Sequence, residues 1–111
     1  MANHIKGQEE ILQKLHISQL NPMQEEAIAT IKKNTNTILL SPTGTGKTLA
    51  FALPLLSFLD PNIQEIQALI LVPSRELAIQ IEQVIRTMGT GFKANAVYGG
   101  RHFMGVLIFW K

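Results

Sequence analysis

The segment ILLSPTGTGKTLAFALPLL, residues 38–56, decides which fold this chain can adopt. An aliphatic run leads into a turn with two glycines, then into Lys47 and Thr48, and then into a long apolar stretch. A strand, a glycine-rich turn and a helix in this order are typical of a loop that binds phosphate groups. The chemistry of the turn therefore bears on both the fold and the function.

The turn, SPTGTGKT, matches most of the phosphate-loop pattern G-x-x-x-x-G-K-[ST]. A triphosphate needs backbone N–H groups that point inward, and glycine lets the chain approach closely with a positive φ. Gly44 and Gly46 meet that need, Lys47 would place its charge at the β and γ phosphates, and Thr48 would place a hydroxyl on Mg²⁺. The alternative is a tight Gly-Thr-Gly turn beside a solvent-exposed lysine.

The composition describes one small domain with a mild positive charge. The 111 residues are 46% hydrophobic and 16% charged, with a net charge of +2. No acidic residue follows Glu82, whereas Arg86, Lys93, Arg101 and Lys111 do, so the C-terminal quarter would attract phosphates. The alternative is an ordinary solvated basic face. The absence of cysteine excludes disulfides and thiolate metal sites.

No targeting or membrane signal is recognisable in the sequence. The start, MANHIKGQEE, has no apolar signal core. The apolar segments are shorter than the ~20 residues that a membrane-spanning helix needs. We expect a cytoplasmic protein that makes no contact with a membrane.

Local patterns predict helices that alternate with strands. Asn21 and Pro22 indicate a helix start, Gly89 indicates a helix end, and Pro54 predicts a kink or an early stop. We expect helices over residues 8–15, 21–33, 47–59 and 74–88, and strands over residues 37–40, 68–72 and 94–98, the first two of them buried. This order predicts βαβ units, hence an α/β fold of three layers in which helices flank short parallel strands.

Gln24 has two interpretations. Its amide carries a donor and an acceptor, so it could pair with the N6/N7 edge of adenine and select ATP over GTP. With Asn21 as the helix cap, however, Gln24 is the third helical position, where it would complete a capping box. The local pattern favours the cap.

Three separated motifs, LNPMQ, SPTGTGKT and PSRELAIQ, resemble the Q motif, motif I and motif Ia of the DEAD-box RNA helicases in order and spacing. YGG at 98–100 looks like the GG element of that family. The resemblance implies that residues 1–101 are the N-terminal part of a P-loop, RecA-like, ATP-binding helicase domain. Residues 102–111 do not resemble the family's sequence after the GG element, so we expect an atypical tail there.

The resemblance also implies roles for individual residues. Mg²⁺ would be held through Thr48, and Lys47 would stabilise charge in the transition state. For Arg75 and Glu76 the alternative is an ordinary pair of solvated charges in the first turn of a helix. The resemblance implies that ATP would contact Gln24, Ser41, Pro42, Thr43, Gly44, Thr45, Gly46, Lys47 and Thr48. It implies that the RNA backbone would contact Pro73, Ser74, Arg75, Gly99 and Gly100.

The sequence departs from the family pattern at several positions. Ser41 replaces the first glycine of the phosphate-loop pattern, as a small residue commonly does in this family. The family usually has an aromatic residue upstream of the Q motif that stacks on adenine, but the first aromatic here is Phe51. Asn21 and His16 replace the usual threonine and glycine. We expect ATP to be only modestly preferred over GTP.

The chain does not contain every group that hydrolysis needs. A carboxylate must hold Mg²⁺ and another acid must orient water, but Asp60 is the single aspartate and no D-E-A-D sequence is present. We expect a truncated or frameshifted fragment that binds ATP and RNA without hydrolysing ATP or unwinding RNA. The alternatives are a non-catalytic nucleotide- or RNA-binding module and a non-functional truncated product.

The end of the chain, VLIFW at 106–110, is an uncharged run of high β propensity and an aggregation hazard when exposed. We expect self-association through open sheet edges and through this tail. The alternative is a genuine terminal strand that covers the sheet.

Overall fold

The computed structural model describes residues 8–98 and, as strand backbone, residues 105–110. The chain divides into a helical unit, residues 17–58, and a sheet unit, residues 1–16 with 59–111. Within the described residues no helix combines the length and hydrophobicity that a bilayer span requires.

The helical unit contains α2 (Pro22–Lys33) and α3 (Lys47–Phe58), which pack against each other. α2 begins as expected, because Asn21 caps it and Pro22 takes a position where no backbone N–H is needed. α3 continues for a full turn past Pro54, so the early stop is wrong. The buried side chains of this unit are Gln24, Ala27, Leu49, Ala50, Ala52, Leu53, Pro54 and Leu56.

Residues 37–40 do not form the buried strand that their composition predicts. They lie outside every described strand, and Ile38 and Leu40 are 88% and 89% exposed. A strand is stable only when a neighbour pairs with its backbone, and no described residue pairs with this segment. High β propensity without a partner therefore does not produce a strand here.

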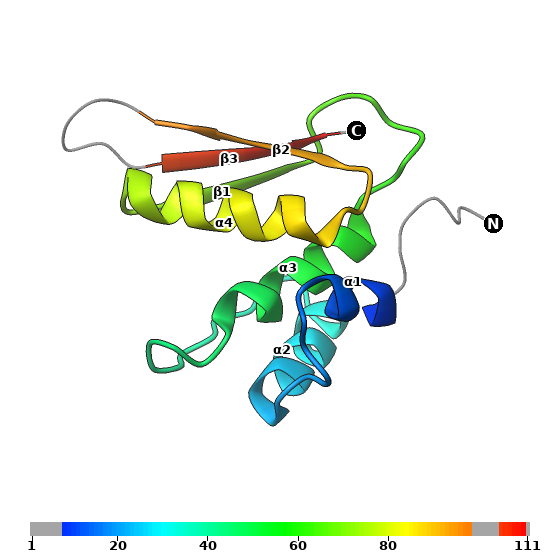
Figure 1. The fold of residues 1–111 in the computed structure, drawn as a ribbon, viewed down its shortest axis with the longest axis vertical. Coiled ribbons are helices and arrows are strands. Elements are labelled where there is room, and N and C mark those ends of the chain that lie inside the picture. The colour runs from blue at the N-terminus through cyan, green and yellow to red at the C-terminus, as the bar shows by residue number, and fades with distance from the viewer. Residues whose placement is uncertain (1–7, 99–104, 111) are drawn as a thin grey trace. The chain divides into compact units, whose positions relative to one another are not determined.

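The sheet unit contains α1 (Gln8–Lys14), β1 (Ala68–Val72), α4 (Arg75–Met88), β2 (Lys93–Val97) and β3 (Gly105–Trp110). The strand order is β1-β3-β2, and β3 is antiparallel to both neighbours. β1 and β2 therefore run in the same direction and are joined through α4, as a βαβ unit requires. Figure 1 shows β3 between the other two strands and α4 along the sheet.

The expected parallel pairing is wrong, because β3 separates the two strands that run in the same direction. β3 follows β2 after only residues 98–104, and a parallel neighbour needs a crossover of a dozen or more residues. The tail forms a strand, and its residues 105–110 supply the central strand of the sheet.

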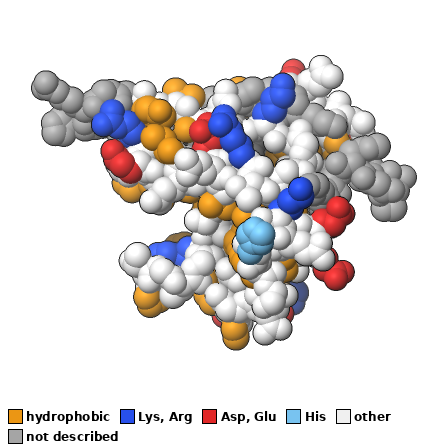
Figure 2. Space-filling view, in the orientation of Figure 1, with side chains coloured by type: hydrophobic (Ala, Val, Ile, Leu, Met, Phe, Trp, Pro, Cys, Tyr) orange, Lys and Arg blue, Asp and Glu red, His pale blue; other side chains and the backbone are white. Residues whose placement is uncertain are grey.

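The sheet of this unit has one covered face. Burial alternates along β1 and β2, and α4 contacts all three strands. Leu69, Leu71 and Val97 are 60%, 61% and 52% exposed, so they lie on the opposite face. The predictions of a three-layer arrangement and of a fully buried β1 are therefore wrong for this unit. Figure 2 shows that some hydrophobic side chains remain at the surface among polar ones.

The residues that follow α1 and α4 include one each in the left-handed backbone conformation. Gly89 closes α4 with φ of 60°, as the sequence predicts. His16 follows α1 with φ of 59°. A side chain is disfavoured in this region, so His16 takes this conformation at some cost in conformational energy.

Candidate nucleotide and RNA sites

The phosphate loop joins residues 37–40 to α3, and its two glycines have positive φ angles. Gly44 has φ of 81° and Gly46 has φ of 88°. A Cβ on Gly44 would meet only open space, so this position needs glycine for its backbone angle alone. A Cβ on Gly46 would also collide with the side-chain amide of Gln24. Both glycines are thus required by geometry, as the motif predicts.

Hydroxyl groups tie the first half of the loop together. Thr45 Oγ1 donates to the Pro42 carbonyl at 2.7 Å and lies 2.6 Å from Ser41 Oγ. Because Thr45 has a single hydroxyl proton, Ser41 is the donor in the second bond. Ser41, which replaces the first glycine of the pattern, therefore helps to hold the loop closed.

Lys47 reaches back across the loop. Its Nζ donates to the Ser41 carbonyl at 2.9 Å. An ammonium has three donors, so two remain for an anion held above the loop. A backbone carbonyl therefore orients Lys47, and no partner for this lysine was predicted from the sequence.

Gln24 links the start of α2 to the phosphate loop. The capping box is confirmed: the Asn21 N–H donates to Gln24 Oε1 at 2.9 Å, and the Gln24 N–H donates to Asn21 Oδ1 at 2.8 Å. Gln24 Nε2 also donates to the Gly46 carbonyl at 3.1 Å. The residue is only 5% exposed, so its amide is already occupied on both sides by the protein.

Asn21 is a loop-holding residue that the sequence did not reveal. Its Nδ2 donates to the Thr45 carbonyl at 3.0 Å, across 24 positions of sequence. Asn21 and Gln24 thus hold two successive carbonyls of the loop. The helix cap was recognisable from local sequence, but a contact over this separation has no local signal.

The start of α3 is built differently from the starts of α2 and α4. Asn21 and Ser74 cap α2 and α4 with side-chain oxygens, whereas α3 follows Gly46, which has no side chain. The first N–H groups of a helix have no partner within the helix. The first turn of α3 has no acidic residue and contains Lys47 and Thr48, so the local charge favours an anion.

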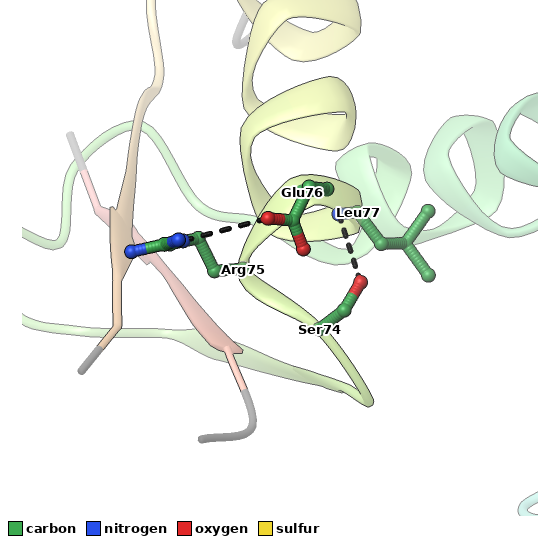
Figure 3. A network of polar contacts seen from close by, with 4 residues as sticks. All are labelled: Ser74, Arg75, Glu76 and Leu77. Atoms are coloured by element: carbon green, nitrogen blue, oxygen red, sulfur yellow. Dashed lines mark hydrogen bonds and ion pairs between the residues drawn. The ribbon is translucent and has the colours of Figure 1, made fainter. Parts of the chain in front are cut away.

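The second candidate segment, Pro73, Ser74 and Arg75, lies where β1 ends and α4 begins. Ser74 Oγ accepts from the Leu77 N–H at 3.2 Å, which leaves the hydroxyl proton available to donate. Arg75 Nε lies 3.5 Å from a Glu76 carboxylate oxygen (Figure 3). Both side chains are substantially exposed, and such a pair contributes only ~0–1 kcal/mol.

The same edge of the sheet carries the ends of β1 and β2. Val72 and Val97, the last residues of these strands, pair with Gly105 and Val106 at the start of β3. The segment after β1 and the segment after β2 therefore begin on either side of β3. Gly99 and Gly100, which were expected to contact RNA, lie outside the described residues.

Acidic groups that could hold a metal do not cluster in the described part of the chain. It contains no group of three His, Asp or Glu side chains suited to a metal ion. Asp60 lies in a turn, where its Oδ1 accepts from the Asn62 N–H at 2.9 Å. Thr48 is the one predicted magnesium contact, and the residue is partly exposed.

Comparison with known proteins identifies the family. Residues 21–106 match the family model described as DEAD/DEAH box helicase. The chain belongs to this family. Membership implies a RecA-like α/β fold, and the matched range includes the phosphate loop, α4 and the strands β1 and β2.

The similar relatives are RNA helicases by name. The chain is 40% identical to the DEAD-box ATP-dependent RNA helicase CshC of Bacillus cereus over 90 residues, 79% of the chain and 23% of that protein. It is 48% identical to the probable ATP-dependent RNA helicase YfmL of Bacillus subtilis over 81 residues, 71% of the chain and 22% of that protein. It is 48% identical to the ATP-dependent RNA helicase DHH1 of Eremothecium gossypii over 69 residues, 62% of the chain and 14% of that protein.

We predict that alanine at the two loop glycines has unequal costs. Gly44→Ala should destabilise the helical unit by about 1–2 kcal/mol, the cost of a side chain at left-handed φ. Gly46→Ala should add the loss of the Gln24 hydrogen bonds, each worth ~1 kcal/mol. Urea denaturation followed by circular dichroism measures both.

The Gln24→Ala background provides the control for this comparison. Without the Gln24 amide no collision remains at Gly46, so the two glycine substitutions should then cost nearly the same. Equal costs in the unmodified chain would contradict a structural role for the Gln24 contact.

Proposed function

We propose that this chain binds ATP with Mg²⁺ through residues 41–48 and binds the sugar-phosphate backbone of RNA through Pro73, Ser74 and Arg75. On this proposal it is part of an ATP-dependent RNA helicase and neither hydrolyses ATP nor unwinds RNA by itself. The observation that carries the proposal is the phosphate loop, whose glycines, lysine and uncapped helix start form one anion-binding arrangement.

Support for ATP comes from how well the loop fits a triphosphate. Free N–H groups at the start of α3, two donors of Lys47 and the Thr48 hydroxyl suit phosphate oxygens and Mg²⁺. Mg²⁺ usually keeps several waters and takes few protein ligands when phosphates supply the rest, so one hydroxyl is a reasonable protein contribution. When bound, the ion would neutralise charge on the phosphates.

The role of Gln24 is narrower than direct recognition of adenine. One amide N–H and one lone pair remain after the capping box and the Gly46 contact are counted. We propose that any adenine contact uses these remaining groups and that Gln24 mainly holds the loop in shape. Because no aromatic residue precedes Phe51, the preference for ATP over GTP should be modest.

Support for RNA comes from the start of α4. The planar guanidinium of Arg75 suits a phosphate group, and its exposed pairing with Glu76 is weak enough to exchange for one. Ser74 retains a proton to donate. Gly99 and Gly100 come shortly after β2 in the sequence, and we propose that they complete the contact. Contacts of this kind position a strand without reading its bases.

A binding module without turnover is the second candidate function. This candidate is favoured because the single aspartate, Asp60, accepts a hydrogen bond from the Asn62 N–H within a turn of the sheet unit. A non-functional product would lack the organised loop contacts of Ser41, Thr45 and Lys47 in solution, so nucleotide binding separates it from the other two. The cytoplasmic location stays a prediction.

We predict that ATP binding depends on Lys47 and on Mg²⁺. Lys47→Ala should weaken binding at least about tenfold, ~1.4 kcal/mol, because the charge facing the phosphates is lost. Lys33→Ala, an exposed lysine at the end of α2, is the matched control and should leave binding unchanged. Calorimetric titration with ATP, with and without Mg²⁺, measures this. Equal affinities for the two variants would refute the assignment of the loop.

We predict that RNA binding is independent of sequence and weakens with salt, because phosphate contacts release counterions. Arg75→Ala should weaken binding alike on several single-stranded RNAs and lower the salt slope by ~1. Lys33→Ala, an exposed lysine at the end of α2, is the control and should leave RNA binding nearly unchanged. Fluorescence anisotropy over a series of salt concentrations provides the measurement. Loss on one RNA sequence only would argue against backbone recognition.

We predict no RNA-stimulated ATP turnover by this chain. The reason is the missing carboxylate for Mg²⁺ and for water, which phosphoryl transfer requires. Phosphate release should match that of the Lys47→Ala variant purified in parallel, which controls for contaminating helicase. Stimulated release that the Lys47→Ala variant lacks would overturn this half of the proposal.

A further inference from the structure

The two outer edges of the sheet differ in how their backbone groups are occupied. β3 lies between β1 and β2, so each of these strands has one edge directed away from it. Unpaired N–H and C=O groups on such an edge are a template for another strand. The register and one side-chain hydrogen bond show which edge is protected.

The outer edge of β2 is blocked by α4. The Ala96 N–H donates to a Glu82 carboxylate oxygen at 2.7 Å, so it points away from β3 and is already satisfied. Arg86 lies 3.6 Å from the same oxygen. β2 also contains the exposed Lys93, a residue type that discourages edge pairing. A further strand cannot pair here without displacing Glu82.

The direction of the Ala96 N–H fixes the direction of every other backbone group in the sheet. Successive residues of an antiparallel strand direct their backbone groups to alternate sides. Asn95 and Val97 therefore bond to β3, and their partners Ile108 and Val106 direct their own groups toward β2.

The remaining residues of β3 consequently direct their groups toward β1. Leu107 is one of them, and it stands opposite Ile70. Ile70 thus bonds to β3, and Leu69 and Leu71, on either side of it, direct their N–H and C=O groups to the outer edge of β1. These two residues also have side chains that are 60% and 61% exposed.

The outer edge of β1 has none of the protection found on β2. Its sequence, ALILV, contains no charge and no proline. No described side chain donates to or accepts from the backbone of Leu69 or Leu71. A row of alternating donors and acceptors is matched along its length by another strand, and because this edge carries no charge, the occupant that it fits is an uncharged strand.

We propose that this edge binds the same edge of a second copy of the chain, in antiparallel orientation. The pairing is self-complementary when Ile70 lies on the twofold axis. Leu69 of each copy then stands opposite Leu71 of the other, and the two pairs exchange four backbone hydrogen bonds. The strand meets no charge of its own kind, because it carries none. The result is a continuous six-stranded sheet, and it does not depend on ATP or RNA binding.

The test is the oligomeric state of the full chain as a function of concentration. The unmodified chain should pass from monomer to dimer in sedimentation equilibrium. Leu71→Pro should abolish the dimer while preserving the fold, because it removes an N–H that β3 does not use. Leu71→Lys should weaken the dimer at least about tenfold, because a charged edge residue opposes pairing.

Val97→Lys is the matched control. Val97 lies in the same cross-strand row as Leu71, has similar exposure, and stands on the blocked strand β2. Edge pairing predicts that Val97→Lys leaves the dimer intact. Circular dichroism verifies that each variant is folded; if Leu71→Pro is unfolded, the two lysine variants decide.

Three outcomes would overturn the proposal. The first is that the unmodified chain is a monomer at every concentration, and the second is that a folded Leu71→Pro or Leu71→Lys variant still forms the dimer. The third is that Leu71→Lys and Val97→Lys weaken the dimer equally, which would indicate contact through the exposed face instead. Slowed amide exchange of Leu69 and Leu71 that appears only at dimer-forming concentrations would support it.

Discussion

The structure depends on the need of every β-strand for a neighbour that pairs with its backbone. β3 meets that need for both β1 and β2, because a central strand has donors and acceptors on its two sides. The same requirement explains the one predicted strand that is absent. Residues 37–40 have the composition of a buried strand, yet no described residue pairs with them, and Ile38 and Leu40 remain exposed.

The direction of the strands places the second candidate site. β1 and β2 run in the same direction although β3 separates them, so the chain leaves both strands at one edge of the sheet. Ser74 and Arg75 follow the first of these ends, and the segment that contains Gly99 follows the second. Ligands of α/β proteins commonly bind at the carboxyl ends of strands, and this arrangement keeps that property even with an antiparallel strand inserted.

The phosphate loop shows how one side chain can serve helix and loop together. Gln24 completes the cap of α2 and holds the carbonyl of Gly46, while Asn21 caps the same helix and holds the carbonyl of Thr45. The start of α2 therefore supports the loop through two side-chain hydrogen bonds. In this family member, the residues of the Q motif would influence nucleotide binding through the shape of the loop, whatever contact they make with the base.

The sequence by itself determined the features that depend on near neighbours. The cap at Asn21, the stop at Gly89, the two loop glycines and the extents of the helices within a residue or two all follow from local chemistry, because their partners lie within a few positions. The family could be predicted for the same reason, since its motifs are short. Tertiary structure decided which strands exist, that β3 enters between β1 and β2, which edge Glu82 protects, and which carbonyls Asn21 and Gln24 hold. Those contacts join residues that are far apart in sequence, and only the folded chain brings their donors and acceptors together.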